Sequence, residues 1–385
     1  MAAPQNRPEK RPLNAGERCA WLRLIRTEHV GPMTFRRLLG RFGSAEAALA
    51  ALPGLARRGS GSKAPKIYPP EKAEAEIEAL EALGAALIAR CEPGYPPLLA
   101  AIEDAPPLIS VLGDPTLLER PAGTTIAVVG ARNASLNGRR LARDIAAGLG
   151  RAGQLVVSGM ARGIDAAAHE GALATGTVGV LAGGVDHVYP KENAALFAEV
   201  RETGALISEM PPGTVPQAQH FPRRNRLISG MAQGVVVIEA GQRSGSLITA
   251  RMALEQGRDV FAVPGSPLDP RNRGSNDLLR QGAILTESAD DVLGALGPLD
   301  PALREAKQDT DIIDDFAAMP EPGEAERAQA AVLECLGPAP VKVDEIIRSC
   351  HLSAPAVSAV LLELELAGRL ERHPGQQVSL IRALK

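Results

Sequence analysis

Residues 125–159 read TIAVVGARNASLNGRRLARDIAAGLGRAGQLVVSG, and this stretch decides the fold. Two short runs of apolar and β-branched residues, 125–130 and 154–159, flank a segment whose apolar residues recur at helical spacing. A strand, a helix and a second strand in that order make a βαβ unit with parallel strands. Four more such runs follow before about residue 297: TVGVLAGG, ALISEM, GVVVIEA and DVFAVPG. The sequence therefore predicts an α/β fold, with a mostly parallel, Rossmann-like sheet as its core.

The pattern changes on both sides of this core, which we expect at residues 93–297. Residues 1–16 lack apolar periodicity and are expected to form a flexible tail, whereas residues 17–92 have helical spacing and predict an N-terminal helical domain. The acidic, Pro-rich segment 298–323 is expected to be a linker. Residues 324–385 predict three helices and two short strands around a Pro-Gly turn, which is typical of a winged helix.

The composition fits a globular protein of a reducing compartment. The formal net charge of −3 is close to zero, so a nucleic-acid partner would have to be held by a local basic patch. The four cysteines form no CxxC pair and have no histidine at zinc-ligand spacing, so we expect neither disulfides nor a metal. There is no apolar signal segment at the N-terminus and no apolar run of membrane-spanning length, so we expect a cytoplasmic protein with no membrane partner.

Loops at the carboxyl ends of the predicted strands carry the candidate ligand-binding residues, because an open parallel sheet forms its ligand crevice there. Arg132 follows the first strand in VVGARNAS, Arg162 lies in the turn of SGMARGID, and Lys191 stands in GGVDHVYPKEN, where it could equally be a solvated surface charge. Asp165 is predicted to cap the helix that begins there. None of these loops is GxGxxG or GxxxxGK[ST], so no nucleotide cofactor is expected.

The segment HFPRRNRLISG places Arg223, Arg224 and Arg226 within one helical turn, beside Phe221. Three guanidinium groups this close repel one another unless anions lie between them, and phosphates are natural counterions. Phe221 offers a face on which a base could stack, and stacking combined with backbone charge holds single strands without reading sequence. The alternative is that Phe221 belongs to the core and the arginines pair with Glu209 or Glu239.

The loop EAGQRSGSLITAR opens a helix with small residues, including Gly245 and Ser246, whose backbone N–H groups could face an anion or simply belong to an ordinary helix cap. A serine nucleophile would need a histidine base, and no GxSxG elbow or similar signature supplies one. The sequence therefore favours binding over catalysis. In the winged helix, the third predicted helix carries Glu363 and Glu365 and no basic residue before Arg369, which favours a protein contact over duplex reading.

Seven motifs in fixed order make the chain similar to the DNA-processing (DprA/Smf) family: VVGARNAS, SGMARGIDAAAHEGAL, GGVDHVYPKEN, ISEMPPG, FPRRNRLISG, EAGQRSGSLITA and GRDVFAVPG. The resemblance implies a sterile-alpha-motif-like (SAM-like) N-terminal domain, the Rossmann-like core and a winged-helix tail. It also implies a homodimer that binds and protects single-stranded DNA and helps load the RecA recombinase during natural transformation and homologous recombination, with no catalytic activity.

Carried over motif by motif, the resemblance adds Asn225 to the candidates. Some relatives have a lysine shortly before this segment, which VPQAQH lacks, and Arg223 supplies a positive charge nearby. The full set of expected nucleic-acid contacts is Arg132, Arg162, Lys191, Phe221, Arg223, Arg224, Asn225, Arg226, Gly245 and Ser246.

Two other functions stay open at this point. A nucleotide or phosphoribosyl hydrolase would use the same phosphate pocket, with Glu239 as its best catalytic candidate. A protein-interaction adaptor would act mainly through its winged-helix tail.

Overall fold

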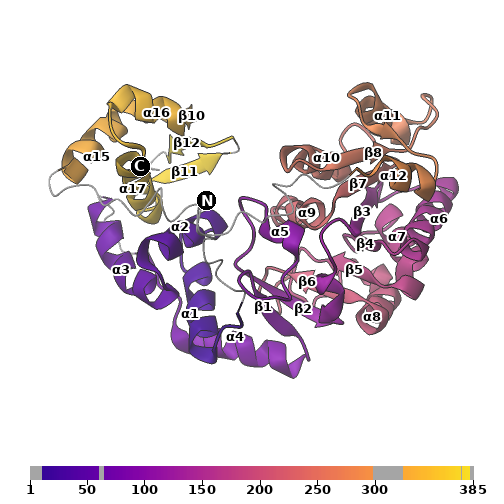
Figure 1. The fold of residues 1–385 in the computed structure, drawn as a ribbon, viewed down its shortest axis with the longest axis horizontal. Helices are drawn as coiled ribbons and strands as arrows, with labels where there is room; N and C mark the ends of the chain where they lie inside the picture. Colours follow the sequence, from indigo (N-terminus) through magenta and orange to yellow (C-terminus); the bar gives the residue numbers. More distant parts are fainter. Residues whose placement is uncertain (1–10, 60–64, 298–323, 374, 382–385) are drawn as a thin grey trace, which may run out of the picture. The chain divides into compact units, whose positions relative to one another are not determined.

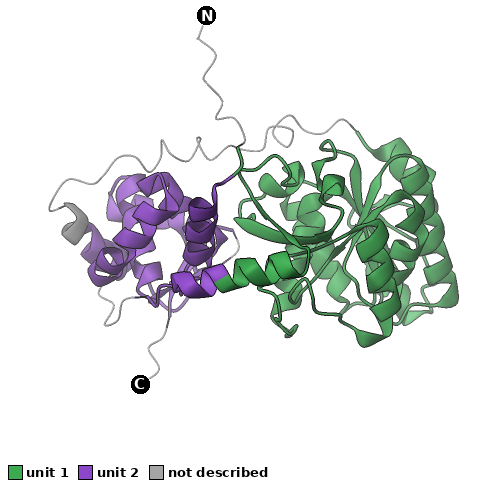
Figure 2. Cartoon of the chain, turned by 90° about the horizontal axis from the view of Figure 1, so that it is seen from below, with its two compact units in different colours: residues 1–12, 75–306 green, residues 13–74, 307–385 purple. Residues whose placement is uncertain are grey.

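The computed structural model describes residues 11–59, 65–297, 324–373 and 375–381. The chain forms two compact units, coloured separately in Figure 2. Among these residues, the first unit takes in 11–12 and 75–297, and the second combines 13–59 and 65–74 with 324–373 and 375–381. The predicted tail at residues 1–16 lies mostly, and the predicted linker at 298–323 wholly, outside the described residues.

Within its described residues the first unit is built on a nine-stranded sheet of order β1-β2-β6-β5-β4-β3-β7-β8-β9 (Figure 1). All neighbours pair in parallel except at one edge, where β2 runs antiparallel to β6 and β1 to β2. The bounds are β1 (Ala86–Ala89), β2 (Leu108–Gly113), β3 (Thr125–Gly130), β4 (Leu155–Ser158), β5 (Thr177–Val180), β6 (Ala205–Ser208), β7 (Gly234–Ile238), β8 (Asp259–Ala262) and β9 (Ile284–Leu285).

The predicted mostly parallel core is confirmed, and β3 to β8 are the six strands that the sequence indicates. Strands β1, β2 and β9 were not predicted from the sequence. Since β1 pairs with β2 through Ala86 to Ala89, the sheet begins before residue 93, where the sequence placed the start of the core. The edge of the core therefore lies inside the segment that had been assigned to the helical domain.

Helices cover both faces of the sheet, because side chains of the buried strands alternate between them. Ile126 and Val128 of β3 point into the layer under α6 and α7, whereas Ala127 and Val129 point into the layer under α9 and α10. The helices of this unit are α5 (Pro97–Ala100), α6 (Leu136–Arg151), α7 (Ile164–Ala172), α8 (Ala194–Thr203), α9 (His220–Met231), α10 (Gly245–Glu255), α11 (Arg273–Arg280) and α12 (Ala289–Ala295).

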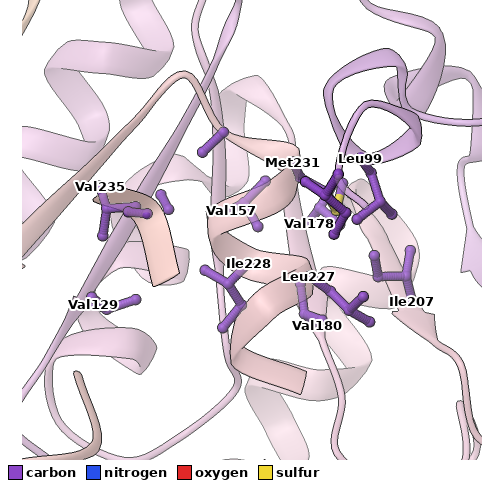
Figure 3. Close-up of a cluster of buried hydrophobic side chains, with 14 of the residues drawn as sticks. Leu99, Val129, Val157, Val178, Val180, Ile207, Leu227, Ile228, Met231 and Val235 are labelled. Atoms are coloured by element: carbon purple, nitrogen blue, oxygen red, sulfur yellow. The ribbon is translucent and has the colours of Figure 1, made fainter. Parts of the chain in front are cut away.

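Helix α9 packs on the sheet through its apolar face. Leu227, Ile228 and Met231 pack on Val129, Val157 and Val235 of the sheet (Figure 3). This packing fixes the rotation of α9 about its axis, and so determines which of its arginines face the carboxyl ends of the strands.

The chain reverses direction across the sheet at β3. It runs outward from β3 through β4 and β5 to β6, and then returns to place β7 on the other side of β3. The loops that leave β3 and β7 therefore diverge, which opens a crevice at the carboxyl edge of the sheet.

The second unit contains the expected N-terminal helices and winged helix. Its helices and small sheet are α1 (Ala15–Arg26), α2 (Pro32–Phe42), α3 (Ala45–Arg58), α15 (Glu324–Cys335), α16 (Val343–Cys350), α17 (Ala354–Leu366), β10 (Val341–Lys342), β11 (Leu370–His373) and β12 (Gln377–Leu380). Asn14 and Ser44 cap α1 and α3 with their side chains, while Pro32 starts α2. Helix α4 (Pro70–Ala82) spans the boundary between the units. Among the described residues, no helix is long and apolar enough to cross a membrane.

Candidate nucleic-acid interface

Two adjoining cavities, of about 860 and 460 Å³, lie at the crevice between the β3 and β7 loops. They share Arg132, Ala161, Phe221 and Arg224, so we treat them as one groove. The larger part is bordered by the loop before α10 and the smaller part by the loop that follows β5. The groove therefore lies where the topology of the sheet predicts a ligand site.

The groove is cationic although the chain as a whole is slightly acidic. Its lining has two carboxylates, Asp165 and Glu192, against six basic side chains, an excess of four positive charges. The six are Arg132, Arg162, Lys191, Arg224, Arg243 and Arg273. Arg243 and Arg273 were not singled out from the sequence, although Arg243 stands inside the motif EAGQRSGSLITA. Such a concentration of charge on a neutral protein is the local patch that a polyanion requires.

One face of α9 lines the groove. Phe221, Arg224, Asn225 and Ile228 all border it, which is the i, i+3, i+4, i+7 spacing of one helical face. Asn225 is held in place because its Nδ2 donates to the carbonyl oxygen of Gly245 at 3.3 Å.

An aromatic cluster stands where the two parts of the groove meet. The guanidinium carbon of Arg132 lies 4.9 Å from the centroid of the Phe221 ring, and the Tyr189 ring lies 5.7 Å from Phe221 in a tilted arrangement. Phe221 is thus half-buried between a cation and a second ring. Tyr189 is 44% exposed, so it is the more open surface for a base. Tyr189 was not predicted from the sequence, although it stands in the motif GGVDHVYPKEN.

Arg224 is buried at the bottom of the groove, and only 7% of its surface is exposed. It fits because residue 159 is glycine: a Cβ there would lie 1.3 Å from its Nη1. Burial lowers the pKa of Arg224, and the nearby Asp165 carboxylate opposes that shift. Since an arginine keeps its proton, the groove contains a poorly solvated cation beside a single carboxylate.

Asp165 does not cap α7 as predicted. The N-cap is Gly163, whose φ of 82° is one that glycine adopts easily, and the carboxylate of Asp165 instead receives hydrogen bonds from the backbone of Ala161 and Gly159. Burial raises its pKa to about 6, against the charge of Arg224 and these hydrogen bonds, which lower it. Asp165 thus sets the charge at the bottom of the groove in a pH-dependent way.

Arg226 does not reach the groove, contrary to the expectation from the sequence. Its side chain is buried and forms an ion pair with Glu209, while Nη1 donates to the Asp104 carbonyl oxygen at 2.8 Å and Nε lies 3.3 Å from the Asp104 carboxylate. Arg223 is exposed and lies on the same side of α9, with Nε 3.8 Å from Glu209. The alternative pairing with Glu209 is therefore correct for these two arginines, and Arg224 alone of the three lines the groove.

The remaining predicted contacts lie at the rim. Arg162 and Lys191 are exposed, and Arg162 pairs loosely with Glu192 at 3.4 Å. Gly245 and Ser246 border the groove at the start of α10. The N-cap of α10 is Ser244, whose Oγ accepts from the Ser246 backbone N–H at 3.4 Å. This bond is the ordinary cap that the sequence left open as an alternative for Ser246.

The carboxylate of Glu239 is hydrogen-bonded to Ser135, outside the groove. It accepts from the backbone N–H of Ser135 at 2.8 Å and also pairs with the Ser135 hydroxyl, which in turn caps α6 by accepting from Gly138 N–H at 2.9 Å. Glu239 does not border either part of the groove. Among the residues whose placement is known, no group of three or more potential ligands could hold a metal ion.

The fold and the groove define the class: a doubly wound, Rossmann-like protein with a cationic crevice at its topological switch point, accompanied by a helical domain and a winged helix. Three family profiles match the chain, one for each of these three domains. They are DprA-like N-terminal HHH domain at residues 15–79, DNA recombination-mediator protein A at 86–297, and DprA winged helix domain at 316–376. The middle profile covers more than half of the chain. The chain therefore belongs to the DNA recombination-mediator protein A (DprA/Smf) family.

Individual relatives and solved structures support the same family. The chain is 38% identical to protein Smf of Escherichia coli over 82% of this chain and 83% of the relative, and 46% identical to DNA processing protein DprA of Bacillus subtilis over 52% and 68%. It is similar to the crystal structure of DNA processing protein A from Streptococcus pneumoniae, with a TM-score of 0.55 and 39% identity over 60% of this chain and 79% of that one. A structure of the Helicobacter pylori protein, described by its single-stranded DNA binding mode, matches with a TM-score of 0.50 and 26% identity over 55% and 94%.

Proposed function

We propose that this protein binds single-stranded DNA in the groove and breaks no bond in it. The observation that carries the proposal is the excess of positive side chains around an aromatic cluster, at the crevice between the β3 and β7 loops. Phosphates would lie against Arg132, Arg224 and the rim cations, and bases against Tyr189 and Phe221. The single-stranded DNA binding described for the Helicobacter pylori relative supports the same ligand.

The test is a fluorescence anisotropy titration of labelled oligothymidine at several salt concentrations. Arg132→Ala removes an exposed groove cation and should reduce both the affinity and the salt slope. The control is Arg151→Ala, which removes the same charge from the last turn of α6, at the amino ends of the strands and so away from the groove. Equal slopes for the two variants would exclude the groove as the binding site.

The role in recombination is part of the proposal. A mediator of DNA recombination has to deliver single strands to a recombinase, and the family description supports this role for the chain. We propose that a homodimer of this protein helps RecA to assemble on single-stranded DNA, as in natural transformation. Sedimentation of the free protein tests the dimer, and RecA-dependent strand exchange on DNA coated with single-strand-binding protein tests the loading.

The hydrolase alternative is not favoured. Its best catalytic residue, Glu239, is engaged with Ser135 and lies outside the groove lining. Release of base from nucleoside monophosphates that is lost in Glu239→Gln would nevertheless favour an enzyme, so this measurement decides between the two functions.

A further inference from the structure

Helix α17 of the winged helix contributes to two apolar cores. Val357, Val360, Leu361 and Leu364 point into the core of the winged helix itself. Leu362 and Leu366, four residues apart, belong instead to the core of the N-terminal helices, together with side chains such as Phe35, Leu38 and Leu55. A helix that is apolar on two faces needs a partner on each of them. Here both partners belong to the second unit.

Polar contacts surround the second face of α17. Glu363, only 8% exposed, accepts from Nε of Arg58 at 2.8 Å, and Glu365 accepts from Oγ1 of Thr34 at 2.5 Å. Beside α17, Arg369 donates to the carbonyl oxygen of Gly59 at 3.3 Å. The two acidic residues that make this helix unsuited to a phosphate surface therefore face donors on the N-terminal helices.

The two domains are in close backbone contact at Gly59, immediately after α3. A Cβ at this position would lie 2.2 Å from the backbone carbonyl oxygen of Glu363 and 2.9 Å from the Cβ of Ala367. The backbone φ of Gly59 is −66°, which any residue can adopt, so its conformation does not require glycine. The need for a glycine arises from the close contact with α17.

The third helix of a DNA-binding winged helix normally enters the major groove. We propose that in this protein the third helix is instead a docking element for the chain's own N-terminal helical domain, and that the winged helix does not read duplex DNA. The two acidic side chains and the two leucines that would have to face DNA are used in this intramolecular contact. The N-terminal helices and the winged helix then act as one module, although about 295 residues separate Gly59 from the start of α17 in the sequence, and most residues of the first unit lie in that interval of the chain.

The test is a pair of glycine substitutions in the full chain, carrying a protease site inserted within residues 298–323. After cleavage, gel filtration shows whether the winged helix remains with the rest of the protein. Gly59→Ala places a methyl group against the backbone of α17 and should release the winged-helix fragment. Gly54→Ala, in α3 where a Cβ meets nothing within 4 Å, is the matched control and should leave the fragments together. Separation of the unsubstituted fragments, or equal behaviour of the two variants, overturns the proposal.

Charge exchange provides a second route that does not depend on how Gly59→Ala folds. Glu363→Arg should release the winged helix because it faces Arg58, and combining it with Arg58→Glu should restore the association. The pairing would be contradicted if the double variant did not recover the association of the fragments although circular dichroism showed that both variants were folded. Finally, hydrogen exchange of α17 should not change when a blunt-ended DNA duplex is added to the unsubstituted protein, and protection of α17 by the duplex would refute the second half of the proposal.

Discussion

Arg224 and Arg226 are two residues apart, yet the structure predicts opposite consequences when each is replaced by methionine, which keeps most of the side-chain stem and removes the charge. Arg226 and Glu209 are both more than nine-tenths buried. Removing one partner of a buried ion pair leaves the other charge without compensation and costs about 3–5 kcal/mol. Arg226→Met should therefore lower the free energy of unfolding by an amount near the lower end of that range, because Arg223 remains 3.8 Å from Glu209.

Arg224→Met should cost much less stability. The pKa of the neighbouring Asp165 is about 6 even though Arg224 lowers it, so in the variant Asp165 can take up a proton at neutral pH for at most about 1.4 kcal/mol, and no stranded charge remains. In the groove, however, Arg224 would donate charge-assisted hydrogen bonds to a phosphate, each contributing about 1.5–3 kcal/mol. We expect Kd for oligothymidine to rise roughly ten- to a hundredfold, and the slope of log K against log salt to fall by ~0.7.

The assays are denaturant unfolding and anisotropy titrations of both variants, carried out in the same buffers. The predicted pattern is a stable Arg224→Met that binds weakly, and a destabilised Arg226→Met whose folded fraction keeps the normal salt slope. Two results would refute these roles of the two arginines: an Arg226→Met that retains its stability but loses salt slope, or an Arg224→Met that binds normally.

Three further predictions concern the same groove and its supports. Because burial raises the pKa of Asp165 from 3.8 to about 6, the folded state binds more protons than the unfolded state between these pH values, so the contribution of this group to stability falls as pH rises through that window. The free energy of unfolding of Asp165→Asn, measured by urea unfolding at each pH, should therefore rise by about 3 kcal/mol relative to wild type between the two ends of this window. Burial lowers the pKa of His169 from 6.5 to about 3, so the stability that this histidine contributes depends on pH with the opposite sign and is lost as pH falls below 6.5. The free energy of unfolding of His169→Gln should lack this part of the pH dependence, and an unchanged pH profile would count against the burial of His169 as its cause. Tyr189→Ala should weaken oligothymidine binding by about 1–3 kcal/mol while Tyr189→Phe binds normally, and equal affinities for all three proteins would show that no base stacks there.

Much of the core could be predicted because buried parallel strands are short apolar runs separated by helical spacing. The runs that became β3 to β8 are of this kind. Strand β9 has only two residues, and β2 follows a Pro-rich stretch and the four-residue helix α5, which is too short to mark a βαβ unit. Neither strand therefore has a distinct signal in the sequence. The domain edge moved for the same reason, since β1 is recognisable as a strand only through its pairing with β2.

The candidate site was predicted in part. Two of the predicted residues, Arg223 and Arg226, do not border the groove. The others do: Arg132, Arg162, Lys191, Phe221, Arg224, Asn225, Gly245 and Ser246. Helical geometry separates these arginines, because positions 224 and 226 point about 200° apart on a helix whereas 223 and 226 lie on the same side. Tyr189 and Arg273 could not be found in this way. They lie in irregular loops or at the start of a short helix, where the direction of a side chain depends on tertiary packing.

The basic side chains of the groove come from segments between residues 132 and 273 that meet only when the whole sheet is assembled. A proteolytic fragment or a misfolded chain would contain some of the same arginines, but scattered and accompanied by the acidic residues that keep the total charge near zero. Affinity for a polyanion is therefore a property of the complete sheet, and a damaged copy of this protein would lose its ligand instead of binding it weakly and indiscriminately.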